Sequence, residues 1–482
     1  MNSNNKNSLL LNTIYIIFFF TIVYYFWDFL TLYPMGFMAD DSFFYTQIAY
    51  NIGVNKFSSW DGINLTNSYH ILWISIISLT SLILSFFTEI KEHHLMAHVF
   101  VYFSIILIFF KYYSAKILDS FILLGIIVSG YILMENITVI FLLFVIYKET
   151  LKYLKNKKTS YLLILSFFLI PLARIDAIAL VGFIPLILFI KTRDKFFFYL
   201  LISLFFGLIS NLTIYFMIAG EFYSVSSYVK MNQNITNTME HRIVNNALYS
   251  NIFPLGWLTL KMRGYLLLSF FLFFLVNLTI NKKKQTGLFF GFFLGLYSYF
   301  FIQLFSNYID TWYYSIMFGS LFLVFKLFNM NFFWKKSVLY IFYFFIILLF
   351  LGKLYNSFKY YDYRVEYINE IKQIEEYVPQ KSKIYQYDLA GHLGFYSNIK
   401  VINGDGRVNS FEYARDLLNQ NLSDYLIKNK ICYLTDIFKP KSYGEEVIID
   451  QSKLVVKYKD VILIKKFNNF NLFKLINCDN NL

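Results

Sequence analysis

Two adjacent carboxylates, Asp40 and Asp41, follow the first long apolar stretch of the chain. Carboxylates at a membrane boundary are costly to desolvate, so their position there needs a structural or a chemical reason. One reason is a helix start before residues 42–51, because acidic side chains favour helix N-termini. The other is catalysis or binding, because a carboxylate at the mouth of a cavity can act as a general base or hold a cation. The two reasons are compatible.

Three further ionisable groups interrupt apolar sequence. Glu135 stands where a helix is expected to begin, and Arg174 and Asp176 lie within a long apolar run. The helix dipole favours an acid at a helix start, and a buried ion pair is the ordinary explanation for the other two. A functional explanation is also open, because the planar fork of an arginine suits phosphate oxygens. Glu135 could also join Asp40 and Asp41 in an oxygen site for Mg²⁺ or Mn²⁺, which makes a divalent cation a candidate cofactor.

The composition indicates which elements must position these groups. Of the 482 residues, 57% are hydrophobic and only 15% are charged, whereas soluble domains carry about 25% charged residues. Such a chain cannot cover one soluble core with polar surface, so a polytopic α-helical membrane protein is predicted. The hydrophobicity excludes a disordered chain, and a count of two cysteines excludes a disulfide scaffold. The net charge of +13 requires no nucleic-acid partner, because membrane topology accounts for it.

The placement of lysine and arginine predicts that topology. About 20 apolar residues span a bilayer as a helix, and flanking cations favour the cytoplasm. Placing every basic cluster inside gives about eleven transmembrane helices within residues 1–357, with the N-terminus inside. The first outer loop, 33–93, then contains Lys56 and His70, and the second covers 220–262. The predicted spans are 12–32, 94–110, 117–134, 136–150, two short helices that meet near Arg174, 197–219, 264–281, 287–305, 312–330 and 337–357.

The segment 71–88 is the exception to this topology, because it is apolar enough to span. If it crossed the membrane, the later basic clusters would fall outside. It is therefore interpreted as an interfacial or re-entrant helix in the first outer loop.

Residues 358–482 differ in composition from the rest of the chain, because their charges are dense and balanced. Short strand patterns at Lys383–Tyr387 and Val461–Ile464 alternate with helical stretches at 363–377 and 411–429. These patterns predict a small α/β domain outside the membrane. Both cysteines, Cys432 and Cys478, fall in this region, and either a disulfide or two free thiols is open.

The segment from Asp40 to Trp73 contains an ordered series of short motifs: Asp40-Asp41-Ser42-Phe43-Phe44-Tyr45, Ile48-Ala49-Tyr50-Asn51, Asp61-Gly62 and Thr66-Asn67-Ser68-Tyr69-His70. The series resembles the first extracytoplasmic loop of bacterial GT-C class glycosyltransferases, the superfamily of protein O-mannosyltransferases and aminoarabinose transferases. That loop typically has the pattern D-D-x-F-x-Y-x-x-I-A-x-N, then D-G, then T-N-G-[FY]-H-P-L-W. This chain departs from it at Ser68, where Gly is usual, and at Ile71, where Pro is usual.

Three other segments are similar to the same family. They are Ser129-Gly130 with Met134-Glu135-Asn136, which resembles S-G-x-E-T, Ala173–Ala177, which resembles R-x-D, and the tail from Tyr387 to Asn409. In the tail, Asp405-Gly406 stands where the family more often has D-x-x-G. Together with the first loop, these matches are distributed over most of the chain.

The resemblance implies a function. Members of the family transfer a sugar from a polyprenyl phosphate to an acceptor on the outer face of the bacterial cytoplasmic membrane, with inversion. It implies Asp40 as the general base, with Asp41 as the alternative or as its partner, and Glu135 in the same site. Arg174 is then the preferred phosphate ligand, accompanied by Asp176, with His70 and Lys56 as further candidates. Some members depend on a divalent metal and others do not. The acceptor could be a lipid-linked glycan, lipopolysaccharide, a wall polymer or a protein.

Other classes of protein share some of these features. A transporter or lipid flippase would also have many helices and an intramembrane Arg–Asp pair, but it leaves the adjacent acids of the first loop and the outer domain unexplained. A glycan polymerase or ligase, and a non-catalytic sensor or scaffold, are further alternatives. The loop motif favours the glycosyltransferase.

Overall fold

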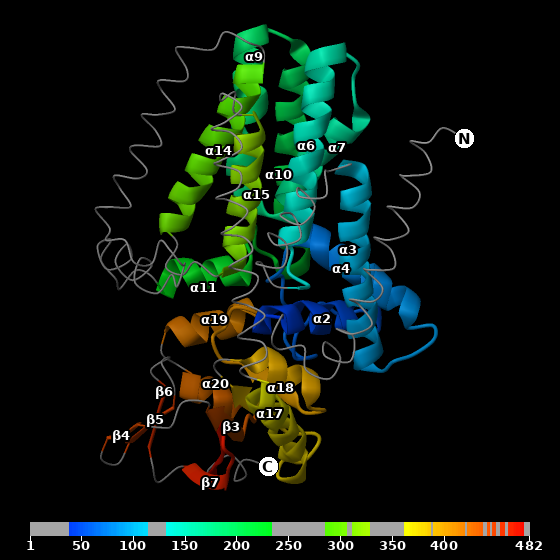
Figure 1. The fold of residues 1–482 in the computed structure, drawn as a ribbon. Coiled ribbons are helices and arrows are strands. Elements are labelled where there is room, and N and C mark those ends of the chain that lie inside the picture. The colour runs from blue at the N-terminus through cyan, green and yellow to red at the C-terminus, as the bar shows by residue number, and fades with distance from the viewer. Residues whose placement is uncertain are drawn as a thin grey trace.

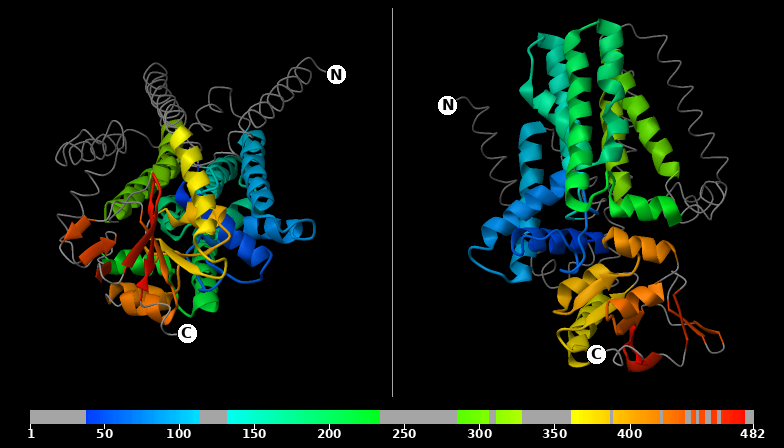
Figure 2. Two further views of the ribbon diagram at one scale, coloured as in Figure 1. Left: turned by 90° about the horizontal axis from the view of Figure 1, so that it is seen from below. Right: turned by 180° about the vertical axis from the view of Figure 1, so that it is seen from behind.

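The computed structural model is mostly helical and has a small sheet. A helical bundle and a C-terminal α/β region lie at opposite ends, with helix α2 (Asp40–Gly53) across the junction (Figure 1). The view from behind shows the same order (Figure 2). The structure describes residues 38–113, 132–233, 285–305, 311–327, 361–386, 389–419, 422–436, 441–443, 446–449, 454–457 and 461–476.

Most helices of the bundle are apolar, as the sequence predicts. Those that correspond to a predicted span with stated bounds begin and end within six residues of the prediction, whereas the helix at Val225–Gln233 lies in the segment 220–262, which was predicted as an outer loop. Four predicted segments lie wholly or mostly outside the described residues: 12–32, 117–134, 264–281 and 337–357. The helices after α2 are α3 (Ile71–Leu84), α4 (Lys91–Tyr113), α6 (Asn136–Asn156), α7 (Tyr161–Ala173), α8 (Ile178–Val181), α9 (Phe183–Thr192), α10 (Lys195–Ala219), α11 (Val225–Gln233), α14 (Gln285–Phe305) and α15 (Thr311–Leu327).

Three helical stretches among the described residues are long and apolar enough to cross a membrane: Lys91–Phe109, Ile175–Thr192 and Lys195–Ala219. Helix α3 is apolar but has only 14 residues. At 1.5 Å per residue it extends about 21 Å, which is less than the roughly 30 Å of the hydrocarbon core. That residues 71–88 do not cross the membrane stays a prediction.

Two short helices meet at Arg174, as the sequence predicts. Helix α7 ends at Ala173, and Arg174 has extended backbone with φ −162° and ψ 128°. A single 3₁₀ turn at Ile175–Ala177 then leads into α8. Glycines on α14 allow that helix to pack closely on α8 and α9. A Cβ at Gly295 would lie 1.9 Å from the carbonyl oxygen of Leu180, so only glycine permits this approach.

The C-terminal region is built on a mixed five-stranded sheet in the order β2-β1-β3-β8-β7. Strand β1 pairs in parallel with β2 and β3, and the β3–β8 and β8–β7 pairs are antiparallel. Parallel neighbours require crossover connections, and helices supply them here. The elements are α17 (Tyr361–Gln373), η4 (Ile374–Glu376), β1 (Lys383–Gln386), α18 (Ala390–Tyr396), β2 (Lys400–Asn403), α19 (Phe411–Leu418), α20 (Leu422–Lys428), β3 (Tyr433–Asp436), β7 (Val461–Lys466) and β8 (Asn471–Leu475).

A second, three-stranded antiparallel sheet contains β4 (Lys441–Tyr443), β5 (Glu446–Ile449) and β6 (Leu454–Lys457). Cys432, directly before β3, is disulfide-bonded. The sequence has one other cysteine, Cys478, which lies outside the described residues. Of the two alternatives that the sequence left open for Cys432, the structure shows the disulfide.

Candidate functional site

Helix α2 directs its two acids to different neighbours. Its N-cap is Ala39, and both Asp40 and Asp41 lie in its first turn, where the helix dipole favours negative charge. Adjacent residues of an α-helix are about 100° apart around its axis. Asp40 points to the C-terminal region, whereas Asp41 lies one turn before Tyr45 on the side of the bundle. The two carboxylates therefore have different environments.

Asp40 is bound by the start of helix α18. The backbone N–H of Gly391 donates to its Oδ2 at 3.0 Å, and that of His392 donates to its Oδ1 at 2.9 Å. The imidazole Nδ1 of His392 lies 2.6 Å from the same Oδ1. Helix α18 approaches so closely that a Cβ at Gly391 would lie 2.5 Å from the backbone oxygen of Asp40. These contacts occupy the carboxylate that the sequence prefers as the general base.

The first loop strengthens this junction. Trp60 donates from its indole to the carbonyl oxygen of Val401 in β2 at 3.1 Å. Its ring lies against α18, because a Cβ at Gly394 would be 2.4 Å from Cζ2 of Trp60. Phe43 of α2 packs on the ring of His392 with centroids 4.6 Å apart. The acids of α2 and the C-terminal region are thus parts of one packed unit.

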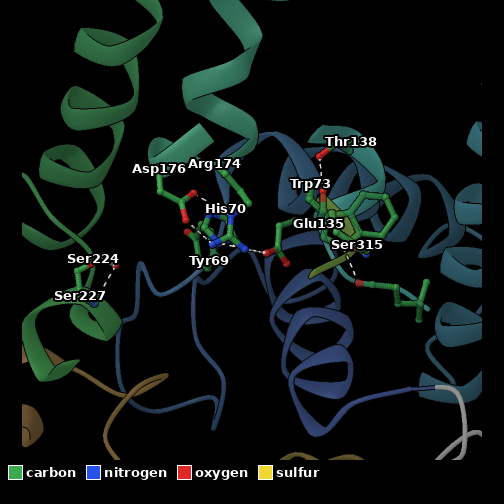
Figure 3. Close-up of polar contacts among 12 residues, drawn as sticks. Tyr69, His70, Trp73, Glu135, Thr138, Arg174, Asp176, Ser224, Ser227 and Ser315 are labelled. Carbon is green, nitrogen blue, oxygen red and sulfur yellow. Dashed lines mark hydrogen bonds and ion pairs between the residues drawn. The ribbon is translucent and has the colours of Figure 1, made fainter. Parts of the chain in front are cut away.

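A buried ionic cluster lies on the bundle side of α2. Arg174 donates from Nε to Oδ1 of Asp176 at 2.9 Å and from Nη2 to Oδ2 at 2.7 Å. Its Nη1 donates to Oε1 of Glu135, so one guanidinium joins two carboxylates (Figure 3). The side chains of Arg174 and Glu135 are 3% and 1% exposed. The break between α7 and α8 places Arg174 here, and the start of α6 places Glu135.

His70 completes the cluster from the first loop. Its Nε2 lies 3.5 Å from Oε1 of Glu135 (Figure 3). Burial lowers the pKa of His70 to about 4, although the charge of Glu135 opposes this shift. The imidazole is therefore neutral at neutral pH. Lys230 of α11 also acts on this imidazole through its positive charge, which lowers the same pKa.

Tyrosines line the cluster. The ring of Tyr313 lies 4.3 Å from Cζ of Arg174, a cation–π distance. Tyr45 of α2 is buried, and burial together with the negative charge of Glu135 raises its pKa well above the usual value. With 41 tyrosines in the chain, a tyrosine beside a motif carries little information.

Two buried oxygens of this cluster lack a hydrogen-bond partner in the described part of the chain. They are Oε2 of Glu135 and the hydroxyl of Tyr299, which lies within electrostatic reach of Arg174 and Asp176. Buried polar atoms are nearly always hydrogen-bonded in folded proteins. Two such atoms in one cluster indicate a place where a polar ligand or ordered water completes the hydrogen bonding.

The T-N-S-Y-H motif positions His70 by tying the first loop to α11. Asn67 accepts from the backbone N–H of Val225 at 3.0 Å and donates to the carbonyl oxygen of Tyr223 at 3.1 Å. Ser68 accepts from the N–H of Ser226 at 2.9 Å. A glycine, the usual residue of the family at this position, could not make that last bond. The departure at Ser68 thus adds a contact between the loop and α11.

A second set of bonds fixes the position of Glu135. Trp73 of α3 donates from its indole to the carbonyl oxygen of Leu133 at 2.8 Å. Ser42 of α2 donates to the carbonyl oxygen of Ile132 at 2.8 Å. Both donors belong to the first loop, so the loop motif holds the segment that carries Glu135.

The structure does not bring all of the predicted residues together. Lys56 is exposed, and its ammonium donates to the carbonyl oxygen of Gly53 at the end of α2. The trio proposed for a metal is also divided, because Asp40 is bound to α18 and Glu135 to Arg174. Among the described residues, no group of three or more His, Cys, Asp or Glu side chains could hold a metal ion. The site residues that the structure does gather are Glu135, Arg174, Asp176 and His70.

No protein-family model matches this chain, and no curated protein matches it. The loop motif and the geometry of the ionic cluster are therefore the features of this chain that bear on its function.

Proposed function

We propose that this protein is an inverting glycosyltransferase of the GT-C class, which moves a sugar from a polyprenyl phosphate to an acceptor at the outer face of the cytoplasmic membrane. The observation that carries the proposal is the cluster of Glu135, Arg174 and His70, which residues of the loop motif hold in place. Its partnerless oxygens offer hydrogen bonds to the hydroxyl groups of a sugar. A transporter would not require the motif of the first loop.

In the proposed reaction, Asp41 is the general base. Asp40 is less suited, because two backbone N–H groups and His392 already surround its carboxylate. Asp41 removes the proton of an acceptor hydroxyl, and that oxygen attacks the anomeric carbon from the face opposite the phosphate. The bond from the anomeric carbon to the phosphate oxygen breaks, and polyprenyl phosphate leaves. The sugar is transferred with inversion.

The charge balance within the cluster supports a phosphate ligand other than Arg174. Glu135 and Asp176 carry two negative charges against one positive charge on Arg174, and His70 is neutral. These four side chains alone would repel an anionic donor. We infer that Arg174 mainly positions the two carboxylates, and that Lys230 of α11 supplies positive charge to the departing phosphate. Lys56 is too exposed to share this role.

The proposal includes the membrane topology predicted from the positive charges. About eleven spans place the N-terminus inside and both α2 and the C-terminal domain outside. Helix α2 then lies along the outer membrane surface, where a lipid-linked donor presents its phosphate. A divalent cation remains a candidate cofactor of the proposed enzyme, and no step above depends on one.

The first test is a comparison of cell-envelope glycans in a deletion strain. Mass spectrometry of lipid-linked and surface glycans is expected to show one sugar missing, restored by the wild-type chain but not by Asp41→Asn. Asp40→Asn is the matched control, and it is expected to restore the sugar at least in part. Unchanged glycans in the deletion strain would contradict the proposal, and restoration by Asp41→Asn would exclude Asp41 as the base.

A further inference from the structure

A basic face lies at the end of the bundle that is opposite to α2 and the C-terminal region (Figure 1). It consists of the turn from α6 to α7 and the turn from α9 to α10. Four cations on this face are exposed and have no carboxylate partner among the described residues: Lys155, Lys158, Arg193 and Lys195. The face is independent of the proposed catalytic site.

The two turns are fixed to each other. Asp194, the N-cap of α10, accepts from the ammonium of Lys157 at 2.5 Å and from the hydroxyl of Tyr153 at 2.9 Å. The ring of Tyr153 also stacks on Phe196 with centroids 4.2 Å apart. These contacts connect the end of α6 to the start of α10, so the cations of both turns are held in one arrangement.

The acidic groups on this face are already occupied. Asp194 is bound by Lys157 and Tyr153. Glu149 accepts from Tyr112 at 2.8 Å and from Ser160 at 2.6 Å. Neither carboxylate is placed to neutralise the four exposed cations, so the face presents net positive charge to an external partner.

Two stretches that are long and apolar enough to cross a membrane meet at this face. Ile175–Thr192 ends there, and Lys195–Ala219 begins there. Large apolar side chains adjoin the cations on the bundle side, with Tyr161 87% exposed and Ile190 57% exposed. Aromatic and aliphatic residues directly beside a ring of cations are typical of the level at which acyl chains meet headgroups.

We propose that this basic face is a binding site for the phosphate groups of anionic phospholipids. A headgroup at this level reaches cations of both turns, and its acyl chains lie along the exposed residues of α7 and α9. The attraction of lysine and arginine near an anionic surface adds up over the residues involved and is screened by salt. A zwitterionic lipid has no net charge, so it gains little from the same cations.

The test removes one exposed cation from each turn and leaves the pair of Lys157 and Asp194 intact. Arg193 has left-handed backbone with φ 54°, and glycine adopts this conformation without strain. Lys158 is exposed, so the variant Lys158→Ala/Arg193→Gly is expected to fold. Lys430→Gly is the matched control, because Lys430 is an exposed lysine with φ 52° at the end of α20 in the C-terminal region.

The full chain in neutral detergent is titrated with phosphatidylglycerol or phosphatidylcholine, and native mass spectrometry measures the bound lipid. The wild type and Lys430→Gly are expected to retain phosphatidylglycerol in preference to phosphatidylcholine, and the double variant is expected to bind it at least roughly tenfold more weakly. Raising the salt concentration is expected to reduce the preference. Equal binding of the two lipids by the wild type, or unchanged binding by the double variant, would overturn the proposal. An equal loss in Lys430→Gly would also overturn it.

Discussion

Replacement of Arg174 by methionine is expected to destabilise the protein by about 3–5 kcal/mol, the range for removing one partner of a buried ion pair. Arg174 is 3% exposed, and it is joined to Glu135, which is 1% exposed, and to Asp176. Methionine keeps much of the apolar volume of the side chain but removes the charge and three hydrogen bonds. The carboxylate of Glu135 would then be buried beside a neutral imidazole.

A second replacement distinguishes lost charge pairing from lost packing. In the double variant Arg174→Met/Glu135→Gln, the buried negative charge is removed together with its partner. We expect the double variant to be about 2 kcal/mol more stable than Arg174→Met alone, which is within the usual range of coupling energies for contacting residues. Arg174→Lys is expected to lie between wild type and Arg174→Met, because an ammonium keeps the charge but cannot reproduce the planar fork.

The assay is the free energy of unfolding in detergent micelles, followed by tryptophan fluorescence during denaturant titration. Arg415→Met is the control, because Arg415 forms an ion pair with Glu221 at 3.0 Å while its side chain is 56% exposed. An exposed pair of this kind contributes about 0–1 kcal/mol. Equal effects of the two arginine replacements would refute the account of the cluster. So would a failure of Glu135→Gln to stabilise Arg174→Met.

Three further predictions concern the junction of the first loop and the pH response. Asp40→Asn removes the charge that two N–H groups of α18 contact. Proteolysis and hydrogen exchange of α18 are therefore expected to accelerate, and unchanged rates would contradict the role of Asp40 in holding α18. Gly394→Ala places a methyl group 2.4 Å from the ring of Trp60, and the overpacking is expected to cost about 1–3 kcal/mol in thermal unfolding. His70 has its pKa lowered to about 4, below an unfolded value of about 6.5. The contribution of the neutral imidazole to stability is therefore present above pH 6.5 and is lost as the pH falls through 4. The free energy of unfolding of His70→Gln is expected to decrease less steeply in acid than that of the wild type, and identical pH profiles of the two proteins would contradict this.

Local features of the fold are predictable from the sequence. The acids in the first turn of α2 and the interruption at Arg174 follow from short-range preferences. The α/β pattern of the C-terminal region follows from period-two and helical spacing. These features depend on residues close together in the chain.

The contacts that distinguish the two acids are not predictable in this way. Asp40 and Gly391 are separated by 351 positions, and no local pattern indicates that they meet. A family motif therefore suggests Asp40 as the base, while the tertiary structure gives it a different neighbour from that of Asp41. The partnership of Glu135 with Arg174 is similar, because each residue has an ordinary local explanation until the fold brings them together.

The central claim is that this protein transfers a sugar from a polyprenyl phosphate with Asp41 as the base. The most direct measurement is sugar transfer by the purified full chain in liposomes, with polyprenyl-phosphate sugars isolated from the native membrane as donors and native envelope glycans as acceptors. The account predicts that wild type forms a product with inverted anomeric configuration. It also predicts that Asp41→Asn binds the donor but forms no product, while Asp40→Asn retains measurable turnover. Product formation by Asp41→Asn at the wild-type rate, or movement of the donor lipid without any transfer, would contradict it.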